Sequence, residues 1–133
     1  LQQLLPVLKQ QGLQVGVIKH AHHKFEIDKP GKDSYELRKA GAQQMLIASS
    51  RLMALMETQA EDMDEPRLSQ LLPRLATEKL DLILVEGFKH EAFPKIELHR
   101  PSVGKPLLHP DDNNIIAIAT DEQLELDNSA RPK

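Results

Sequence analysis

Three strongly apolar segments of the chain end in polar residues, and this arrangement constrains the fold more than any other feature. The segments are LQVGVIKH (13–20), LDLILVEG (80–87) and IIAIATD (115–121). Near-continuous apolar runs of this length, rich in Val, Ile and Leu, are typical of buried strands in a parallel sheet. We therefore predict an α/β fold with a mostly parallel sheet that is flanked by helices on both faces.

Two segments between the strands carry helical patterns and helix-ending signals. Asp33 is expected to cap a short helix that runs through Lys39, because Glu36 stands three residues later and would complete a capping box. A glycine at position 12 is expected to end an earlier helix. The apolar face of that earlier helix is formed by Leu1, Leu4, Leu5 and Leu8.

A third helix is expected over 64–78, with Asp64 as its cap. Its apolar positions recur at helical spacing, but Pro73 lies inside it and predicts a kink or a break. Three further segments read as strands. Segments 43–50 and 51–58 could pair with each other through a tight turn, and segment 95–100 is a short alternating strand.

Length and composition set limits on the class of protein. The 133 residues favour a single domain over 1–133, and a net charge of −3 argues against a protein that coats nucleic acid. The absence of cysteine excludes disulfide scaffolds and thiolate metal sites. No apolar run approaches the roughly 20 residues of a membrane span, so we expect a cytoplasmic protein without membrane contact.

Polar residues at the strand ends mark the candidate binding site, because ligands of open α/β sheets bind outside the carboxyl ends of the strands. Glu86 ends an apolar strand in the manner of a Walker B acid, which could hold Mg²⁺ or orient a water molecule. Gly87 would let the backbone turn close to a ligand. The three pairs at strand ends are Lys19-His20, Glu86-Gly87 and Thr120-Asp121.

The segment after the first apolar strand is rich in histidine. His20 and His22 would share one face of an extended chain, whereas His23 would point away. Such a pair can chelate a transition metal, but a closed site needs further ligands, for which Asp28, Glu26 or His90 are available. The alternative is a polar loop whose histidines hydrogen-bond to backbone or ligand.

The PGKDS stretch (30–34) looks like the end of a phosphate loop but lacks its defining residues. Asp33 stands where Ser or Thr should follow Lys32, and no glycine stands five residues before Gly31. Aromatic residues flank the same loop and the loop after Glu86, where they could contact a flat ligand or a protein partner, or pin the loops to the body. These aromatic residues are Phe25, Tyr35, Phe88 and Phe93.

Taken together, the motifs resemble those of the MobB family. The resemblance rests on VGVIKHAHHKFEIDKPGKDSYELRKAGA (15–42), then DLILVEGFKHE (81–91) and then IAIATD (116–121). It implies a P-loop NTPase-like fold, GTP with Mg²⁺ as ligands, at most weak GTP hydrolysis, and a homodimer. It also implies cooperation with the guanylyltransferase MobA, which attaches GMP to molybdopterin.

The resemblance assigns roles to individual residues. Glu86 would be the catalytic, Walker B-type acid and, together with Asp28, a Mg²⁺ ligand. Thr120 and Asp121 would lie near the guanine base, where a carboxylate can accept two hydrogen bonds. The residues that would line the site near the phosphates or a bound molybdopterin are Lys19, His20, His22, Asp28 and Gly87.

One departure from the family pattern is large. Family members carry G-x-x-x-x-G-K-[ST] just before their first helix, and Leu1 would fall a few residues after it. We therefore expect the natural protein to contain a Walker A segment and strand before Leu1, and a C-terminal helix after the last strand. A different class of function, a metallochaperone or metal-binding module that uses the histidine-rich loop, stands as the alternative.

Overall fold

The computed structural model describes residues 1–21, 25–59 and 65–124. The chain divides into two compact units, Leu1–Lys89 and His90–Lys133. The first unit contains α1 (Leu4–Gln10), β1 (Val15–Lys19), α2 (Asp33–Lys39), β2 (Gln44–Ala48), β3 (Met53–Glu57), α3 (Leu68–Leu71), the 3₁₀ turns η1 (Leu72–Arg74) and η2 (Thr77–Lys79), and β4 (Leu82–Glu86). The second contains β5 (Lys95–His99), the 3₁₀ turn η3 (Pro101–Val103) and β6 (Ile115–Thr120).

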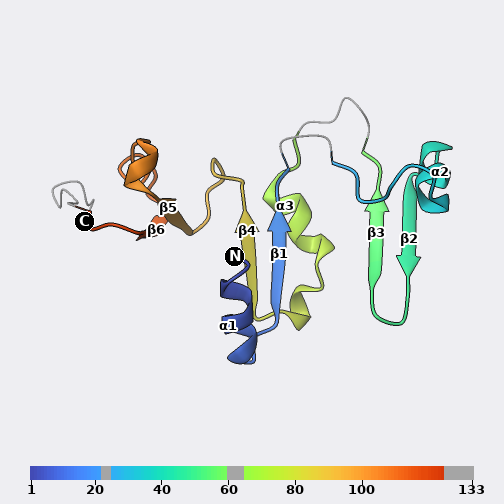
Figure 1. Cartoon of the computed structure of the whole chain (residues 1–133), viewed down its shortest axis with the longest axis horizontal. Coiled ribbons are helices and arrows are strands. Elements are labelled where there is room, and N and C mark those ends of the chain that lie inside the picture. Colours follow the sequence, from blue (N-terminus) through green and yellow to red (C-terminus); the bar gives the residue numbers. More distant parts are fainter. Residues whose placement is uncertain (22–24, 60–64, 125–133) are drawn as a thin grey trace. The chain divides into compact units, whose positions relative to one another are not determined.

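The strands of the described residues pair two by two. In the first unit β1 and β4 are parallel, and Figure 1 shows them side by side with their arrows in the same direction. In the second unit β5 and β6 are also parallel, with an irregularity in register between Lys95 and Ile96. Each of the six strands lies within a segment for which the sequence predicts one, and the predicted predominance of parallel pairing is confirmed.

The third pair, β2 and β3, is an antiparallel hairpin, as the sequence suggests. Its turn lacks glycine and is closed instead by Ser49, whose Oγ accepts hydrogen bonds from the backbone N–H groups of Arg51 (3.2 Å) and Leu52 (3.0 Å). A serine hydroxyl can replace a backbone partner in this way. This turn signal is weaker than an Asn-Gly pair and is easily overlooked in the sequence.

The predicted ends of the first two helices are confirmed, but the predicted start of the second is wrong. Gly12 follows α1 with φ of +82°, and the N–H of Leu13 bonds to the carbonyl of Leu8 (3.2 Å), which completes a Schellman motif. At α2 the residue before the helix is Lys32, and no side chain caps it. Asp33 therefore occupies the first helical position, where its negative charge interacts favourably with the positive end of the helix dipole.

The segment predicted as one helix over 64–78 is broken into short pieces. Its expected cap, Asp64, lies outside the described residues. The α-helical part is the single turn α3, after which Pro73 sits in the 3₁₀ turn η1. Proline cannot donate the backbone hydrogen bond that a continuing α-helix needs, so the predicted break is confirmed.

The apolar core is small, and this differs from the burial that the strand sequences predict. Among the described residues, the buried apolar side chains are those of Ile18, Met56, Leu68 and Phe88. Ile116, in a strand that we expected to be buried, has 70% of its surface exposed. A two-stranded ladder has an edge on each strand and few neighbours to cover its faces, which accounts for the exposure.

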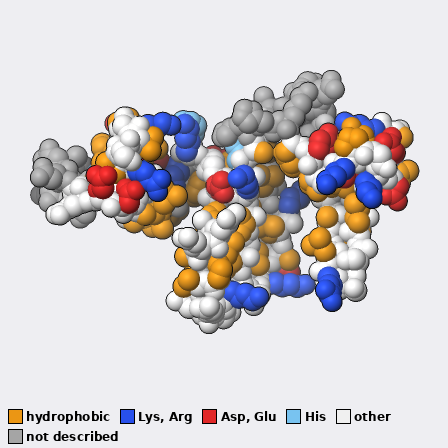
Figure 2. Space-filling view, viewed as in Figure 1, with side chains coloured by type: hydrophobic (Ala, Val, Ile, Leu, Met, Phe, Trp, Pro, Cys, Tyr) orange, Lys and Arg blue, Asp and Glu red, His pale blue; other side chains and the backbone are white. Residues whose placement is uncertain are grey.

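Hydrophobic side chains also remain at the surface over β2 and β3 (Figure 2). Leu46 and Leu55, which are paired across the hairpin, are 58% and 56% exposed. Within the part of the chain that the structure describes, no helix is both long enough and apolar enough to span a membrane.

Candidate functional site

The carboxyl ends of β1 and β4 bring together a lysine and a glutamate that are 67 residues apart in sequence. The parallel register places Lys19 opposite Glu86, and Lys19 Nζ lies 2.9 Å from Glu86 Oε1. Their side chains are 65% and 53% exposed, so both charged groups are open to solvent. Two of the three strand ends that the sequence singles out are therefore adjacent, whereas the third, Thr120-Asp121, belongs to the second unit.

Gly87 follows directly and makes a turn that a larger residue could not make without strain. Its φ is +100°, and a Cβ atom at this position would lie 2.7 Å from the Cβ of His20. The backbone N–H of His20 donates to the carbonyl of Glu86 (2.9 Å), which holds the two chain segments at this distance. The glycine is therefore required by close approach of two backbones as well as by its conformation.

The imidazole of His20 is packed between an aromatic ring and a carboxylate. Its ring stacks on Phe88 with centroids 4.7 Å apart and planes inclined by 28°. Its Nε2 lies 2.5 Å from Oε2 of Glu65, and only 13% of the side chain is exposed. Phe88 itself is buried and has a positive φ of 54°, so it pins the turn after Glu86 to the body.

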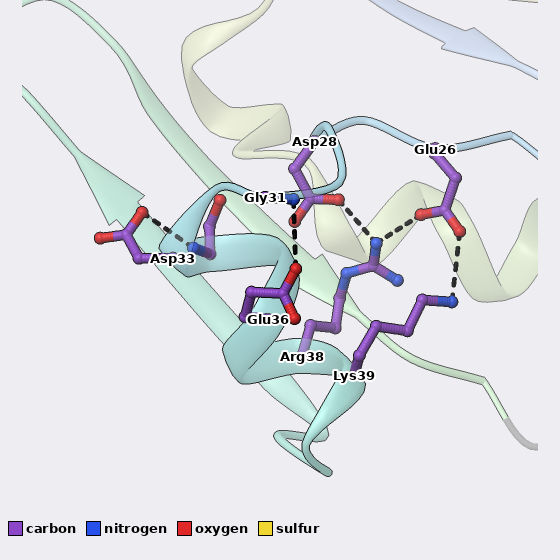
Figure 3. Close-up of polar contacts among 8 residues, drawn as sticks. Glu26, Asp28, Gly31, Asp33, Glu36, Arg38 and Lys39 are labelled. Atoms are coloured by element: carbon purple, nitrogen blue, oxygen red, sulfur yellow. Dashed lines mark hydrogen bonds and ion pairs between the residues drawn. The ribbon is translucent and has the colours of Figure 1, made fainter.

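The loop between β1 and α2 is tied to the helix by an arginine that the sequence did not single out. Figure 3 shows the carboxylates of Glu26 and Asp28 pointing at the guanidinium group of Arg38. Arg38 Nη2 lies 2.6 Å from Asp28 Oδ1, and the two side chains are 16% and 7% exposed. Lys39 adds a longer contact of 3.5 Å to Glu26.

These contacts shift the titration of the groups involved. The hydrogen bond from Arg38 lowers the pKa of Asp28 and of Glu26, against the opposing effect of desolvation. The same two bonds raise the pKa of Arg38. Among the described residues, Asp28 Oδ2 and Arg38 Nε are buried without a hydrogen-bond partner, so the pair is joined through one oxygen only.

The structure does not bring all predicted site residues together. The contacts of the Asp28 carboxylate are with Arg38, and no described contact joins it to Glu86. Its predicted role as a second Mg²⁺ ligand stays a prediction. His22 and His23 lie outside the described residues. Among residues 1–21, 25–59 and 65–124, no three His, Asp or Glu side chains are grouped as metal ligands.

Thr120 and Asp121 lie at the end of β6, in the second unit. The Arg100 side chain contacts Asp121, with Nε 2.7 Å from Oδ2. The Thr120 hydroxyl accepts a hydrogen bond from the backbone N–H of Glu122 (3.3 Å). Their predicted contact with a guanine base stays a prediction.

The second unit also contains polar residues that sequence reasoning missed. Glu97, on β5, is buried, and its two carboxylate oxygens accept the backbone N–H groups of Leu108 (2.7 Å) and His109 (2.9 Å). Lys95 Nζ lies 2.7 Å from Asp112 Oδ2. The alternation of apolar and polar residues along the strand predicts the opposite facing, yet Ile96 and Leu98 are 62% and 83% exposed while Glu97 is buried. The strand sequence alone also cannot show that a loop some ten residues later supplies the two donors.

The sequence matches one protein family and proteins with known names. The model of the family described as "Molybdopterin guanine dinucleotide synthesis protein B" (MobB) matches residues 1–121. A relative from Escherichia coli (strain K12), named molybdopterin-guanine dinucleotide biosynthesis adapter protein, is 52% identical over 128 residues, which are 96% of this chain and 73% of the relative. A Haemophilus influenzae protein of the same name is 41% identical over 127 residues, which are 96% of this chain and 69% of the relative's length.

The fold is similar to that of solved structures of the same family. A crystal structure of molybdopterin-guanine biosynthesis protein B superposes with a TM-score of 0.67 at 23% identity, covering 93% of this chain and 75% of the other. This similarity confirms the predicted α/β, P-loop NTPase-like fold class. On the match over residues 1–121 and the identity with its relatives, the chain belongs to the MobB family.

Proposed function

We propose that this protein is an adapter in the synthesis of molybdopterin guanine dinucleotide, a step of molybdenum cofactor biosynthesis. It binds GTP with Mg²⁺ and serves the guanylyltransferase MobA. Membership in the MobB family and the adapter name of two relatives support the pathway. The pairing of Lys19 with Glu86 at the strand ends is the single observation that supports the GTP site.

The chemistry of this pair suits a nucleotide with a magnesium ion. A carboxylate such as Glu86 can hold Mg²⁺ directly or through water, while phosphate oxygens complete the coordination. The ammonium group of Lys19 can bind a phosphate as a point charge. In the free protein the two charges neutralise each other, and both are exposed enough to exchange partners. Mg²⁺ at Glu86 would repel Lys19 and release it toward the phosphates.

The remaining predicted residues complete the proposal. His20, His22 and Asp28 line the site near the phosphates or a bound molybdopterin. Thr120 and Asp121 lie near the guanine base, and Asp121 exchanges its contact with Arg100 for the base when GTP binds. The protein acts as a cytoplasmic homodimer, and any GTP hydrolysis that it performs is weak.

The test is equilibrium binding of labelled GTP to the full-length protein over a range of Mg²⁺ concentrations. Glu86→Gln keeps the size of the side chain and removes its charge, so we expect affinity for GTP to lose most of its dependence on Mg²⁺. Glu78→Gln, the same change on the exposed turn η2, is the matched control. Mg²⁺ dependence that persists unchanged in Glu86→Gln would refute the assigned role. Hydrolysis is measured on the same samples.

A further inference from the structure

The parallel pair of β5 and β6 ends in an arginine that lies against an aspartate. The register places His99 opposite Thr120, and the next residues along the two strands, Arg100 and Asp121, contact each other, with Arg100 Nε 2.7 Å from Asp121 Oδ2. The backbone of Arg100 is extended (φ −129°, ψ 107°), as expected for a residue before proline, and so continues the direction of β5. A guanidinium group and a carboxylate therefore lie side by side at this end of the ladder.

Most of the hydrogen-bonding capacity of this pair is left for a ligand. The side chains of Arg100 and Asp121 are 67% and 48% exposed. In the described parts of the chain they make no hydrogen bond other than the one between them, which leaves the N–H groups of both Nη atoms and the second carboxylate oxygen. An exposed ion pair of this kind adds little to stability, so exchange of its partners for a ligand costs little.

Guanine carries polar groups in the order that complements this pair. Its amino group and N1–H are donors, and O6 and N7 follow as acceptors. A carboxylate can accept hydrogen bonds from the two donors, whereas an arginine binds O6 and N7 with two parallel N–H groups. Because O6 is adjacent to N1, a guanidinium group beside the Asp121 carboxylate can bind O6 while the carboxylate binds N1–H.

Adenine does not complement the pair. It carries an amino donor in place of O6, and its N1 has no hydrogen. The guanidinium group would then face another donor, and the carboxylate would face a lone pair. A site that hydrogen-bonds one group strongly rejects an analogue that lacks this group, because the polar atoms of the site are left unpaired.

We propose that Arg100 is a specificity-determining residue for guanine, which binds O6 and N7 of the base next to Asp121. This inference rests on the contact between Asp121 and guanine proposed above and adds a second side chain to it. Asp121 releases Arg100 when it binds the base, and the guanidinium group stays beside it with its N–H groups available to the two acceptors. The protein thus distinguishes guanine from adenine at position 6 of the base as well as at position 1.

The experiment compares equilibrium binding of GTP and of 7-deaza-GTP, which has C–H in place of N7, to the full-length protein with Mg²⁺. The unmodified protein should bind 7-deaza-GTP about tenfold more weakly, the effect of losing one hydrogen bond to a charged group. Arg100→Met keeps the length of the side chain and removes its donors. It should weaken GTP binding about tenfold or more and abolish the difference between the two nucleotides.

Two further variants separate recognition of the base from the effect of charge. Arg100→Lys keeps the positive charge but not the two parallel donors, so it should also lose most of the preference for GTP over 7-deaza-GTP. Arg74→Met is the matched control, because Arg74 is 60% exposed and its Nη1 lies 2.9 Å from Oε2 of Glu57. It should leave both affinities unchanged.

Three outcomes would overturn the assignment of Arg100. Equal binding of GTP and 7-deaza-GTP by the unmodified protein would show that no donor contacts N7. A preference for GTP that persists in Arg100→Met would assign N7 to another group. An equal loss of affinity for GTP, 7-deaza-GTP and ATP in Arg100→Met would show that the arginine acts through its charge on the phosphates. Failure of the unmodified protein to bind GTP is distinguishable from all three, because it refutes the proposed nucleotide site itself.

Discussion

Substitution of Gly87 by alanine tests the central geometric feature of the candidate site. The added Cβ would lie 2.7 Å from the Cβ of His20, closer than Cβ atoms approach in real structures. Neither partner can move easily, because the N–H of His20 is bonded to the carbonyl of Glu86 and its ring stacks on Phe88. We therefore expect the substitution to strain the connection between β1 and β4 rather than to be absorbed locally.

Two contributions set the size of the effect on the free energy of unfolding. An L-residue on the positive-φ side, where Gly87 stands at +100°, costs about 1–2 kcal/mol. Extra atoms forced into a packed region cost about 1–3 kcal/mol more. The sum, about 2–5 kcal/mol, is a large part of the 5–15 kcal/mol by which ordinary domains are stable.

Two other glycines separate these contributions. Gly41 has φ of +117°, but no described atom lies within 4 Å of its added Cβ, so Gly41→Ala should cost only the conformational part, about 1–2 kcal/mol. At Gly16 the added Cβ would also meet an atom at 2.7 Å, but that atom is the flexible end of the Leu80 side chain. Gly16→Ala should therefore cost about 1 kcal/mol, at the low end for overpacking.

Urea denaturation followed by circular dichroism gives the three free energies. A thermodynamic cycle with His20→Gly, which removes the opposing Cβ, isolates the contact itself and should show a coupling of about 1 kcal/mol or more. If Gly87→Ala destabilises the protein no more than Gly41→Ala does, or if the cycle shows no coupling, the reasoning about close approach is refuted.

Two predictions concern the second unit. Glu97→Gln keeps only one of the two oxygens that accept the N–H groups of Leu108 and His109. It should therefore lower the free energy of unfolding of the unit by about 1–3 kcal/mol and speed hydrogen exchange at the amide that loses its acceptor. Unchanged exchange at both amides would contradict this. The hydrogen bond from Lys95 lowers the pKa of Asp112 to about 2 from 3.8, so the carboxylate stabilises the fold above about pH 4 and this contribution is lost as the pH falls toward 2. The difference in free energy of unfolding between the natural protein and Asp112→Asn, measured by urea titration, should therefore shrink as the pH falls from about 4 toward 2. A difference that stays constant would argue against the pairing of Asp112 with Lys95.

Much of the candidate site could be predicted because it depends on strand direction alone. Apolar runs that end in Lys19 and Glu86 predict two strands of a parallel sheet. Parallel pairing places the carboxyl ends of neighbouring strands at the same edge of the sheet. The apolar periodicity and Gly12 likewise predict α1 and its end, since both signals lie within a few residues of the helix they describe.

Features that depend on distant partners could not be predicted. Arg38 stands ten residues from Asp28, and nothing in the local pattern selects it over the neighbouring Lys39 as the partner. The cap at Asp33 was wrong because the helix begins one residue earlier than the capping box requires, and Glu36 accepts the N–H of Gly31 instead (3.1 Å, Figure 3). The burial of strands was overestimated because it depends on how many neighbours a strand has, which a single segment does not show.

The separation of 67 residues between Lys19 and Glu86 has a consequence for biosynthesis of the protein. A ribosome that adds about 5–20 residues per second exposes β1 several seconds before β4. The hairpin of β2 and β3 is local and can form in that interval, whereas the β1–β4 pair must wait for chain closure over a long loop. The edge that carries the paired charges is therefore completed late, and the nascent chain cannot bring Lys19 and Glu86 together until β4 has been synthesised.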